Sequence, residues 1–467
     1  MSPPAYRGGH VKKAFYICSS ACLAALAVCY GVWVSEQKDI GILSVVTSIL
    51  VTLLFGVLLI WLVKAIIDAW FGKRDEDTVR PLLRTDGARR YEVLKVGAYI
   101  LVSRFVVFLL VYLMYTAMHG YKGGILDTLE EIWKRFDSPS YLGIAERWYV
   151  TSGDPQYHIM FFPLFPIVIR LFNYITGNTF ASAMLVSLLS SVGAGMMLYK
   201  LLLIDYSEKI SKFTVLLVFI FPAAFFFSAP MTESLFLLIS VTCLYFTRKK
   251  LYLFAGVFGA LAAFTRSQGV LLMVPMGIEA VRELIIMFKT KDKNAWRGLA
   301  SRLTGIIIVP VGLLMYIWVN YSVWGDAFKF LEIQREHWSQ GLSFFFNTVS
   351  YQTDLFIRNL DKVNVETAWG LWFSNLAAIF GTLIIVICGA KKLRASYLGY
   401  FAAYFVMSIG ATWLLSAPRY MTVAFPVMLA LATMCKKWSK KIITIVVIAA
   451  MSLLYTAAFV AGNYQIW

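Results

Sequence analysis

The sequence predicts an all-α integral membrane protein with about 13 transmembrane helices. Hydrophobic residues make up 60% of the chain and charged residues 15%, against about 45–50% and 25% in ordinary soluble proteins. The mean hydropathy of +0.71 points the same way. A soluble protein of 467 residues with this composition would expose large apolar patches to water. The bilayer therefore sets the fold.

Apolar runs close to the length that crosses the hydrocarbon layer, about 20 residues, mark the expected spans. They cover residues 14–34, 41–67, 96–118, 179–203, 213–229, 232–247, 251–265, 269–288, 303–323, 367–388, 396–416, 420–435 and 441–461. A further apolar run, 159–175, contains Pro163 and Pro166, which break or open a helix. Such backbone at membrane depth needs protein cover or a cavity, so we expect a re-entrant or interfacial segment.

The distribution of lysine and arginine predicts the orientation. With the N-terminus inside and 159–175 not crossing, most basic residues fall in inner segments, which are 68–95, 200–212, 248–250, 282–302, 391–394 and 436–441. The net charge of +17 then reflects topology, and no nucleic acid partner is expected. Outer loops without cysteines, most of them short, and the strong positive-inside bias favour a bacterial plasma membrane over the membrane of the endoplasmic reticulum.

Two outer loops, 119–178 and 324–366, are long, which predicts a functional site on that face. The basic, polar segment 68–95 separates the first two spans from the rest. We therefore expect two units, an accessory unit of two helices plus the basic segment over residues 1–92, and a catalytic region over residues 93–467.

The first outer loop carries a carboxylate close to an arginine, in the run from Trp133 to Ala145. Asp137 lies two residues after Arg135, just outside a span. A general base that removes a proton from an acceptor hydroxyl has this chemistry. The alternative is a solvated aspartate that pairs with Arg135.

The same loop continues into an aromatic, proline-broken segment that begins at His158 and includes Phe162. Such a segment could line a groove through which a lipid reaches the site, or form an interfacial aromatic belt. For His158 alone, a hydrogen-bonded loop histidine is the simpler interpretation.

Three more charges lie at the outer membrane edge: Glu233, Arg266 and Arg419. Charges at this depth are costly and are candidates for function. Arginine suits a phosphate, because its planar fork makes bidentate bonds. Snorkelling or mutual pairing of the charges would explain the same residues. Arg104, inside a span near its inner end, is expected to snorkel.

The second outer loop contains Gln334 and Trp338, which share a face if the segment is helical. An amide and an aromatic ring on one face are suited to holding a sugar. An amphipathic helix lying at the interface has the same spacing without that function.

These segments, in this order, resemble the PIG-V family of membrane mannosyltransferases, over about Trp133 to Tyr420. The family's R-W-D-S-x-x-Y-L-x-I-A is similar to Arg135–Ala145, with Phe136 in the place of the tryptophan. Its F-F-P-L-x-P, P-x-x-F-F-x-S-A-x-x-T-E-S-L-F, T-R-S-x-G, Q-x-x-x-W and P-R-[YF] motifs are similar to Phe161–Pro166, Pro222–Phe236, Thr265–Gly269, Gln334–Trp338 and Pro418–Tyr420. Each motif alone is weak, but six in the same order are specific.

The resemblance implies a GT-C fold and an inverting transfer of mannose from a polyprenyl- or dolichyl-phosphate donor to a glycan or glycolipid, on the extracytoplasmic side. It implies that Asp137 is the base and that Arg266, Arg419 and Arg135 bind the donor phosphate. The substrate contacts that we expect are Ser138, Tyr141, His158, Phe162, Glu233, Gln334, Trp338 and Tyr420. No D-x-D motif is present, so neither a metal nor another cofactor is expected.

The sequence departs from the family pattern at Pro139 and Ser140, just before Tyr141, which puts the identity of the acceptor in doubt more than the reaction type. Two alternatives stay open. One is a GT-C transferase of another sugar. The other is a transporter or flippase of a lipid-linked substrate, a class that usually shows repeats and discontinuous helices at the midplane. We find no repeat, and the unusual residues gather at one face.

Overall fold

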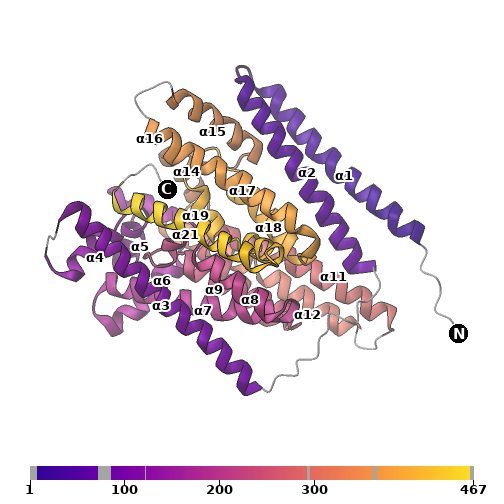
Figure 1. Ribbon diagram of the computed structural model, residues 1–467, viewed down its shortest axis with the longest axis horizontal. Coiled ribbons are helices and arrows are strands. Elements are labelled where there is room, and N and C mark those ends of the chain that lie inside the picture. Colours follow the sequence, from indigo (N-terminus) through magenta and orange to yellow (C-terminus); the bar gives the residue numbers. More distant parts are fainter. Residues whose placement is uncertain (1–7, 72–85, 121–122, 292–294, 361–364, 463–467) are drawn as a thin grey trace.

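The computed structural model describes residues 8–71, 86–120, 123–291, 295–360 and 365–462, and helices make up most of these ranges (Figure 1). An isolated bridge between Leu342 and Ala411 is the single extended pairing among them. The elements are α1 (Gly8–Glu36), α2 (Ile42–Phe71), α3 (Asp86–His119), α4 (Ile125–Trp133), α5 (Ser138–Arg147), η2 (Asp154–Met160), α6 (Leu164–Thr176), α7 (Thr179–Asp205), α8 (Glu208–Phe219), η3 (Ala224–Phe227), α9 (Glu233–Arg248), α10 (Tyr252–Thr265), η4 (Ser267–Leu272), α11 (Met273–Lys289), α12 (Ala295–Ile308), α13 (Val311–Trp324), α14 (Lys329–Trp338), α15 (Phe345–Leu360), α16 (Val365–Thr367), η5 (Ala368–Phe373), α17 (Ser374–Gly389), η6 (Ala390–Lys392), α18 (Ala395–Ile409), α19 (Ala417–Thr422), α20 (Phe425–Met434) and α21 (Trp438–Val460). The prediction of an all-α membrane protein is confirmed.

Seven helical segments in the described ranges are long and apolar enough to cross a membrane. They are Val11–Glu36, Ile42–Phe71, Arg90–His119, Thr179–Asp205, Trp296–Trp324, Val365–Lys392 and Trp438–Val460. Other predicted spans are shorter helices in the structure, such as α10, α18 and α20. Proline explains part of the difference, because α8 ends at Phe219, shortly before Pro222. The count of about 13 stays a prediction.

The apolar run 159–175, which the sequence predicts to be re-entrant or interfacial, lies in a bent part of the chain. The helices η2 and α6 meet at 113°, which is the geometry of a broken span or of a re-entrant loop. Pro163 caps α6, and Pro166 lies in its first turn, where the missing N–H breaks no helical hydrogen bond. The two prolines therefore start the second helix in a new direction.

The helices α1 and α2 form an antiparallel pair on one side of the molecule (Figure 1). The ring of Phe55 on α2 contacts Phe345 at 4.7 Å and Phe405 at 5.8 Å between ring centroids. The indole of Trp33 donates to Asn347 Oδ1 at 3.0 Å. This pair thus shares a core with α15 and α18, and the expected unit boundary at residue 92 falls inside α3.

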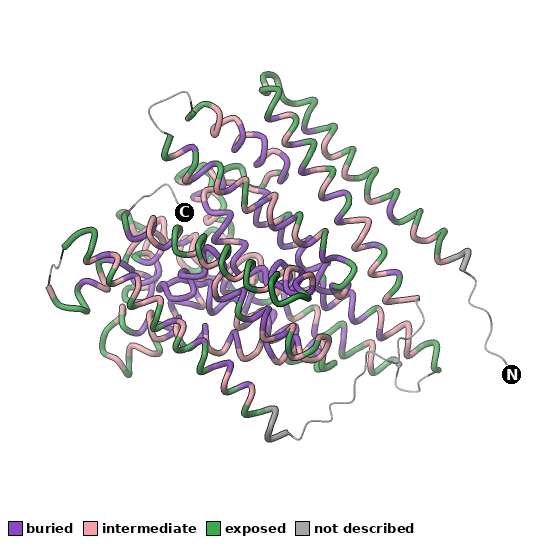
Figure 2. The backbone as a smooth tube through the Cα atoms, in the orientation of Figure 1, coloured by how far each residue is buried: buried purple, intermediate pink, exposed green. Residues whose placement is uncertain are grey.

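Burial is concentrated in the middle of the bundle, while much of α1 and the ends of the outer helices are exposed (Figure 2). The helix α9 lies in this buried region and carries a charge at each end, Glu233 and Arg248. At 1.5 Å per residue these two ends lie about 22 Å apart. Each end belongs to a separate group of paired charges.

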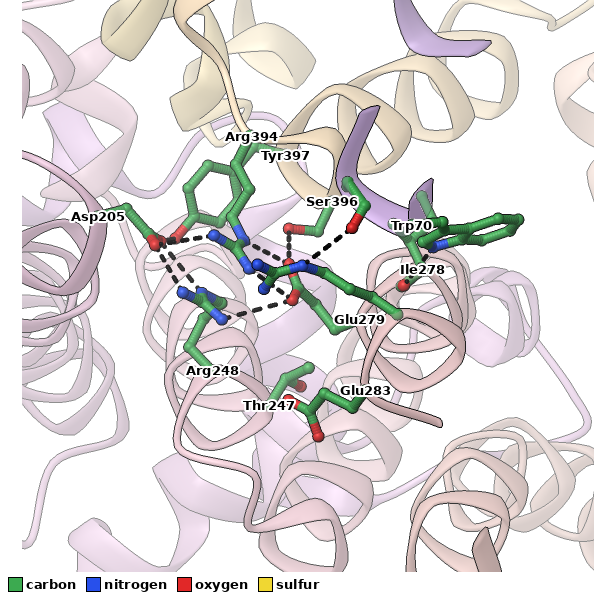
Figure 3. Close-up of polar contacts among 12 residues, drawn as sticks. Trp70, Asp205, Thr247, Arg248, Ile278, Glu279, Glu283, Arg394, Ser396 and Tyr397 are labelled. Atoms are coloured by element: carbon green, nitrogen blue, oxygen red, sulfur yellow. Dashed lines mark hydrogen bonds and ion pairs between the residues drawn. The ribbon is translucent and has the colours of Figure 1, made fainter. Parts of the chain in front are cut away.

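The group around Arg248 is shown in Figure 3. Arg248 pairs with Asp205 at 2.6 Å and with Glu279 at 3.4 Å. Arg394 pairs with the same two carboxylates, at 3.2 Å and 2.5 Å. The hydroxyl of Tyr397 donates to Asp205 Oδ2 at 2.8 Å. We call these five residues, which come from α7, α9, α11 and the start of α18, the inner network.

The expectation that Arg104 snorkels is wrong. Its side chain is buried, and it donates to the carbonyl oxygens of Ala224 at 2.8 Å and Phe219 at 2.7 Å. The carbonyl of Phe219 lies in the last turn of α8, where helical partners are missing, and that of Ala224 lies at the start of η3. Arg104 therefore satisfies a helix end inside the bundle.

Candidate active site

Four charged residues that are far apart in the sequence form one cluster. Arg419 Nη1 lies 2.6 Å from Asp137 Oδ2, and Arg419 Nε lies 2.6 Å from Glu233 Oε1. The same Glu233 oxygen accepts from Arg266 Nη1 at 3.0 Å. We call Asp137, Glu233, Arg266 and Arg419 the outer cluster, because all four come from segments that the sequence places outside. Snorkelling and mutual pairing were the two interpretations of these charges that need no function. The structure shows mutual pairing.

Asp137 is held at the start of α5 by an unusual backbone. Phe136, the residue before it, has a φ of +59°, in the left-handed region that non-glycine residues rarely adopt. Asp137 is the N-cap residue of α5, but its side chain accepts no capping hydrogen bond, although aspartate at this position commonly does so. The carboxylate is bonded to Arg419 instead. It keeps 32% of its side-chain surface exposed, so Asp137 is the member of the outer cluster that solvent can reach.

Glu233 is the centre of the outer cluster. It starts α9 and is fully buried. A buried carboxylate is tolerated when it is paired and hydrogen-bonded. Glu233 Oε1 is paired with both Arg266 and Arg419. Its other oxygen, Oε2, has no hydrogen-bond partner among the described residues.

Arg266 is positioned by a close contact of backbones. It lies between α10 and η4 in extended conformation, and Gly269 N donates to its carbonyl at 2.9 Å. A Cβ added to Gly269 would lie 2.1 Å from the carbonyl carbon of Ala262. Only glycine allows this approach, which accounts for the T-R-S-x-G pattern.

Arg419 is presented by a short helix that buried amides hold in place. Pro418 lies in the first turn of α19, where proline is well tolerated. The N–H of Ala417 donates to Asn375 Oδ1 at 2.9 Å, and Gln352 Nε2 donates to the carbonyl of Leu414 at 2.5 Å. Asn375 and Gln352 were missed at the sequence level. The available signal was an amide within an apolar helix, as at Asn375 in 367–388.

Aromatic rings cover the two arginines. The guanidinium of Arg266 lies over Tyr420 at 5.4 Å and over Phe236 at 5.8 Å from the ring centroids. That of Arg419 lies over Phe226 at 5.0 Å. Rings at these distances attract a cation and reduce its contact with water. Tyr420, predicted as a substrate contact, thus belongs to the surroundings of Arg266.

Several buried hydroxyls next to the outer cluster have no hydrogen-bond partner among the described residues: Ser138, Thr232, Ser234 and Ser416. Each is within three residues of a cluster member in the sequence. Buried polar groups are normally satisfied, and each exception needs an explanation. A polar ligand bound at the cluster is one such explanation, and Ser138 was among the predicted substrate contacts.

Tyr141 lies one turn after Asp137 on α5. Its ring contacts Phe161 and Phe165 edge to face, at 5.1 Å and 5.4 Å. Burial, and to a lesser extent the Asp137 carboxylate, raise the pKa of Tyr141, so that its hydroxyl stays protonated. Tyr141 fixes α5 against the bent segment that follows.

Arg135 does not pair with Asp137. It donates to the carbonyl oxygens of Phe459 at 3.1 Å and Val460 at 3.5 Å, at the end of α21, and to that of Glu131 at 3.2 Å. Cations at a helix C-terminus are favourable. The structure thus gives Arg135 a role in holding α21.

The remaining predicted contacts lie around η2 and α14. Phe162 stacks on Tyr316 at 3.9 Å, and Trp338 meets Phe161 at 6.4 Å. Gln334 donates to Gln340 Oε1 at 3.0 Å, and Gln340 Nε2 donates to the carbonyl oxygen of Trp413 at 2.8 Å, which joins the second outer loop to the segment before Arg419. His158 lines a small pocket with Gly143 and Arg147. Among the described residues, none of these side chains has a hydrogen bond or ion pair with the outer cluster.

The described residues contain no group of three or more His, Cys, Asp or Glu side chains placed as metal ligands would be. Fold and site together define a class: an all-α, multi-pass membrane protein with a buried ionic cluster assembled from the first outer loop, the adjoining ends of α9 and α10, and the short helix α19.

No family model matches the sequence, and no curated protein matches it. Among solved structures, the chain is similar to ArnT from Cupriavidus metallidurans bound to undecaprenyl phosphate, with 16% identity and a TM-score of 0.46 over 76% of this chain and 64% of ArnT. It is also similar to the oligosaccharyltransferase AglB from Archaeoglobus fulgidus in complex with an inhibitory peptide and a dolichol-phosphate, with 10% identity and a TM-score of 0.36 over 78% of this chain and 56% of AglB. The chain spans less than two thirds of the length of either protein.

Proposed function

We propose that this protein is a GT-C-type, inverting glycosyltransferase that moves mannose from a polyprenyl- or dolichyl-phosphate donor to a hydroxyl of a glycan or glycolipid on the extracytoplasmic face. The observation that carries the proposal is the outer cluster. It joins a solvent-accessible carboxylate, Asp137, to two arginines that are mostly buried, Arg266 and Arg419.

The two arginines supply what a leaving lipid phosphate needs. Nη2 of Arg419 makes no hydrogen bond to a described residue, and in Arg266 the same holds for Nε and Nη2. These N–H groups can bind phosphate oxygens, for which the planar guanidinium is well shaped. Preformed cations at the place where negative charge develops stabilise a transition state.

Asp137 supplies the base. Its Oδ2 is bonded to Arg419, and Oδ1 makes no hydrogen bond to a described residue. In the proposed step Oδ1 accepts the proton of the acceptor hydroxyl while the acceptor oxygen bonds to the anomeric carbon. The bond from that carbon to the phosphate oxygen breaks, and the lipid phosphate leaves with the electron pair toward Arg266 and Arg419. A single displacement of this kind inverts the anomeric centre.

The choice of mannose over another sugar is based on the six motifs that resemble those of the PIG-V family. The unpartnered hydroxyls of Ser138, Thr232 and Ser234 beside the cluster suit the hydroxyls of a sugar. The partners of the enzyme are then the lipid-phosphate sugar, the acceptor and the surrounding membrane lipids.

The test is Asp137→Asn in purified protein, assayed with polyprenyl-phosphate mannose and a membrane lipid extract. The amide keeps the shape of the side chain but does not accept the proton, so transfer is lost while donor binding survives. Turnover near the wild-type rate would contradict the assignment of the base. Transport of the intact donor across vesicles, without transfer, would favour the flippase. Transfer from glucose or arabinose donors alone would favour another sugar.

A further inference from the structure

Lysines from three separate segments meet at the face that the sequence places inside. The segments are the inner part of α2, the short helix η6, and the junction between α20 and α21. They form one surface, because η6 contacts both α2 and α20. We call this surface the inner lysine patch, and its members are Lys64, Lys391, Lys392, Lys436, Lys437 and Lys440.

Contacts between side chains hold the three segments together. The ammonium groups of Lys64 and Lys391 lie 5.5 Å and 5.2 Å from the centroid of the same indole ring, that of Trp61. Lys392 Nζ donates to the carbonyl oxygen of Thr433 at 2.8 Å, just before the next lysines in the chain. Like charges gathered on one surface repel one another, and a bound anion relieves that repulsion.

The charges of the inner lysine patch are not neutralised within the described part of the chain. All six lysines are exposed, and none of them forms an ion pair with a described carboxylate. Even Asp68, one helical turn after Lys64 on α2, is not paired with it. Six ammonium groups thus remain available to a ligand from outside the protein.

A basic inner face would follow from membrane topology alone. Elsewhere on this face, however, several basic residues are neutralised. Lys212 pairs with Glu92 at 2.6 Å and with Glu208 at 2.9 Å, and the two arginines of the inner network share two carboxylates. The inner lysine patch is different, because its charge stays uncompensated although the segments that carry it are packed together.

Apolar side chains place the patch at the depth of the lipid headgroups. Trp438, within the run of lysines that begins α21, is 74% exposed, and Ile443, further along the same helix, is 62% exposed. Tryptophan is enriched at membrane–water interfaces. Lys64 lies within the span Ile42–Phe71, and from such a position a long lysine side chain reaches the headgroup layer. The patch is therefore open to the bilayer as well as to water.

We propose that the inner lysine patch binds the phosphate groups of anionic phospholipids in the inner leaflet of the membrane. A basic cluster directly beside a spanning helix is attracted to anionic lipid, and here lysines of three segments are concentrated around an exposed tryptophan. The proposal goes beyond the transferase and does not depend on it, since no residue of the patch belongs to the outer cluster.

The test uses native mass spectrometry to count the lipids that the purified full-length protein retains from mixed micelles. The micelles contain equal amounts of phosphatidylglycerol, which is anionic, and phosphatidylcholine, which is not. The wild type should retain phosphatidylglycerol in preference, and the absence of a preference would overturn the proposal. Each lysine near an anionic surface contributes an affinity factor of about five. Lys436→Gln/Lys437→Gln should therefore lower the preference by about 25-fold.

The matched control is Lys249→Gln/Lys250→Gln, which removes two adjacent, exposed lysines from the same face. This variant should keep a preference close to that of the wild type. Equal losses in the two double variants would mean that the lipid responds to the overall charge of the inner face, and they would overturn the proposal.

A charge-conserving variant separates binding from folding. Lys436→Arg/Lys437→Arg keeps both positive charges and should retain phosphatidylglycerol as the wild type does. A loss as large as in the glutamine variant would show that these lysines act through the local structure, and the proposal would be wrong.

Glycerol 3-phosphate, the soluble counterpart of the headgroup, distinguishes a lipid from a free phosphate. At an equal concentration it should not displace phosphatidylglycerol, because it lacks the acyl chains that hold the lipid beside Trp438 and Ile443. Displacement would make the patch a site for soluble anions and would overturn its assignment to a lipid.

Discussion

The contact between Glu233 and Arg419 is the part of the outer cluster whose loss should be most costly. Glu233 is fully buried, and the side chain of Arg419 is 7% exposed. Replacing Arg419 by alanine leaves Glu233 with Arg266 at 3.0 Å and leaves Asp137 without its cation. Breaking a buried ion pair from one side costs about 3–5 kcal/mol. Asp137 is 32% exposed, so its share is closer to that of a surface pair, about 0–1 kcal/mol.

We therefore expect Arg419→Ala to lower the free energy of unfolding by about 3 kcal/mol, the lower end of the range for a broken buried pair, because Arg266 still neutralises Glu233. Glu233→Gln combined with Arg419→Ala should cost less than the sum of the single variants, with a coupling of about 0.5–3 kcal/mol. The measurement is unfolding in mixed detergent micelles, followed by circular dichroism. Arg358→Ala, on an exposed pair, is the control and should change stability by less than about 0.5 kcal/mol.

The same variants also test the proposed binding of the donor's phosphate group. Arg419→Ala should weaken binding of the lipid-phosphate donor, and Arg419→Lys should recover only part of it, because an ammonium cannot form the bidentate fork. Additive stabilities in the cycle would refute the geometry of the cluster. Donor affinity equal to the wild type in both Arg266→Ala and Arg419→Ala would place the phosphate site elsewhere, with Lys134 and Arg135 as the next candidates.

Two other predictions concern the backbone and the topology. Gly269→Ala should be strongly destabilising and should reduce donor affinity, because the new Cβ would lie 2.1 Å from the backbone of α10 and displace Arg266. Thermal unfolding and donor titration measure these two effects. A stable variant with normal donor affinity would contradict the prediction. In a background without the native cysteines, Leu342→Cys, at a position that is 81% exposed, should react with an impermeant maleimide from outside the cell, whereas Lys437→Cys should not; the reverse labelling would overturn the orientation.

Composition was enough to predict a helical membrane protein, because 60% hydrophobic residues leave few other options. The extent of each span was harder to predict. The run 213–229 looks continuous by hydropathy, yet α8 ends at Phe219. Arg104, from another helix, donates to the carbonyl oxygens of Phe219 and Ala224. Such a contact joins residues more than 100 positions apart and has no local signature.

For the site, the residue types predicted the members but not their pairing. Asp137, Glu233, Arg266 and Arg419 each stood out as charges at a membrane edge, and the structure brings them together. Arg135 was expected either to bind the donor phosphate or to pair with Asp137, which lies two residues further on. The backbone turns sharply at Phe136, so the two side chains take different partners.

The helix α9 ends in an ionic cluster on both sides, and this fixes its register. Within a bilayer there is no hydrophobic driving force between helices, so apolar contacts alone specify the register of one helix against its neighbours only weakly. A slip of one turn, about 5.4 Å, would separate Glu233 from its two arginines and Arg248 from its two carboxylates in the same movement. A bundle assembled with α9 in the wrong register therefore loses the ion pairs at both ends of this helix. The ion pairs at its two ends therefore hold α9 in place against the helices on both sides of the bundle.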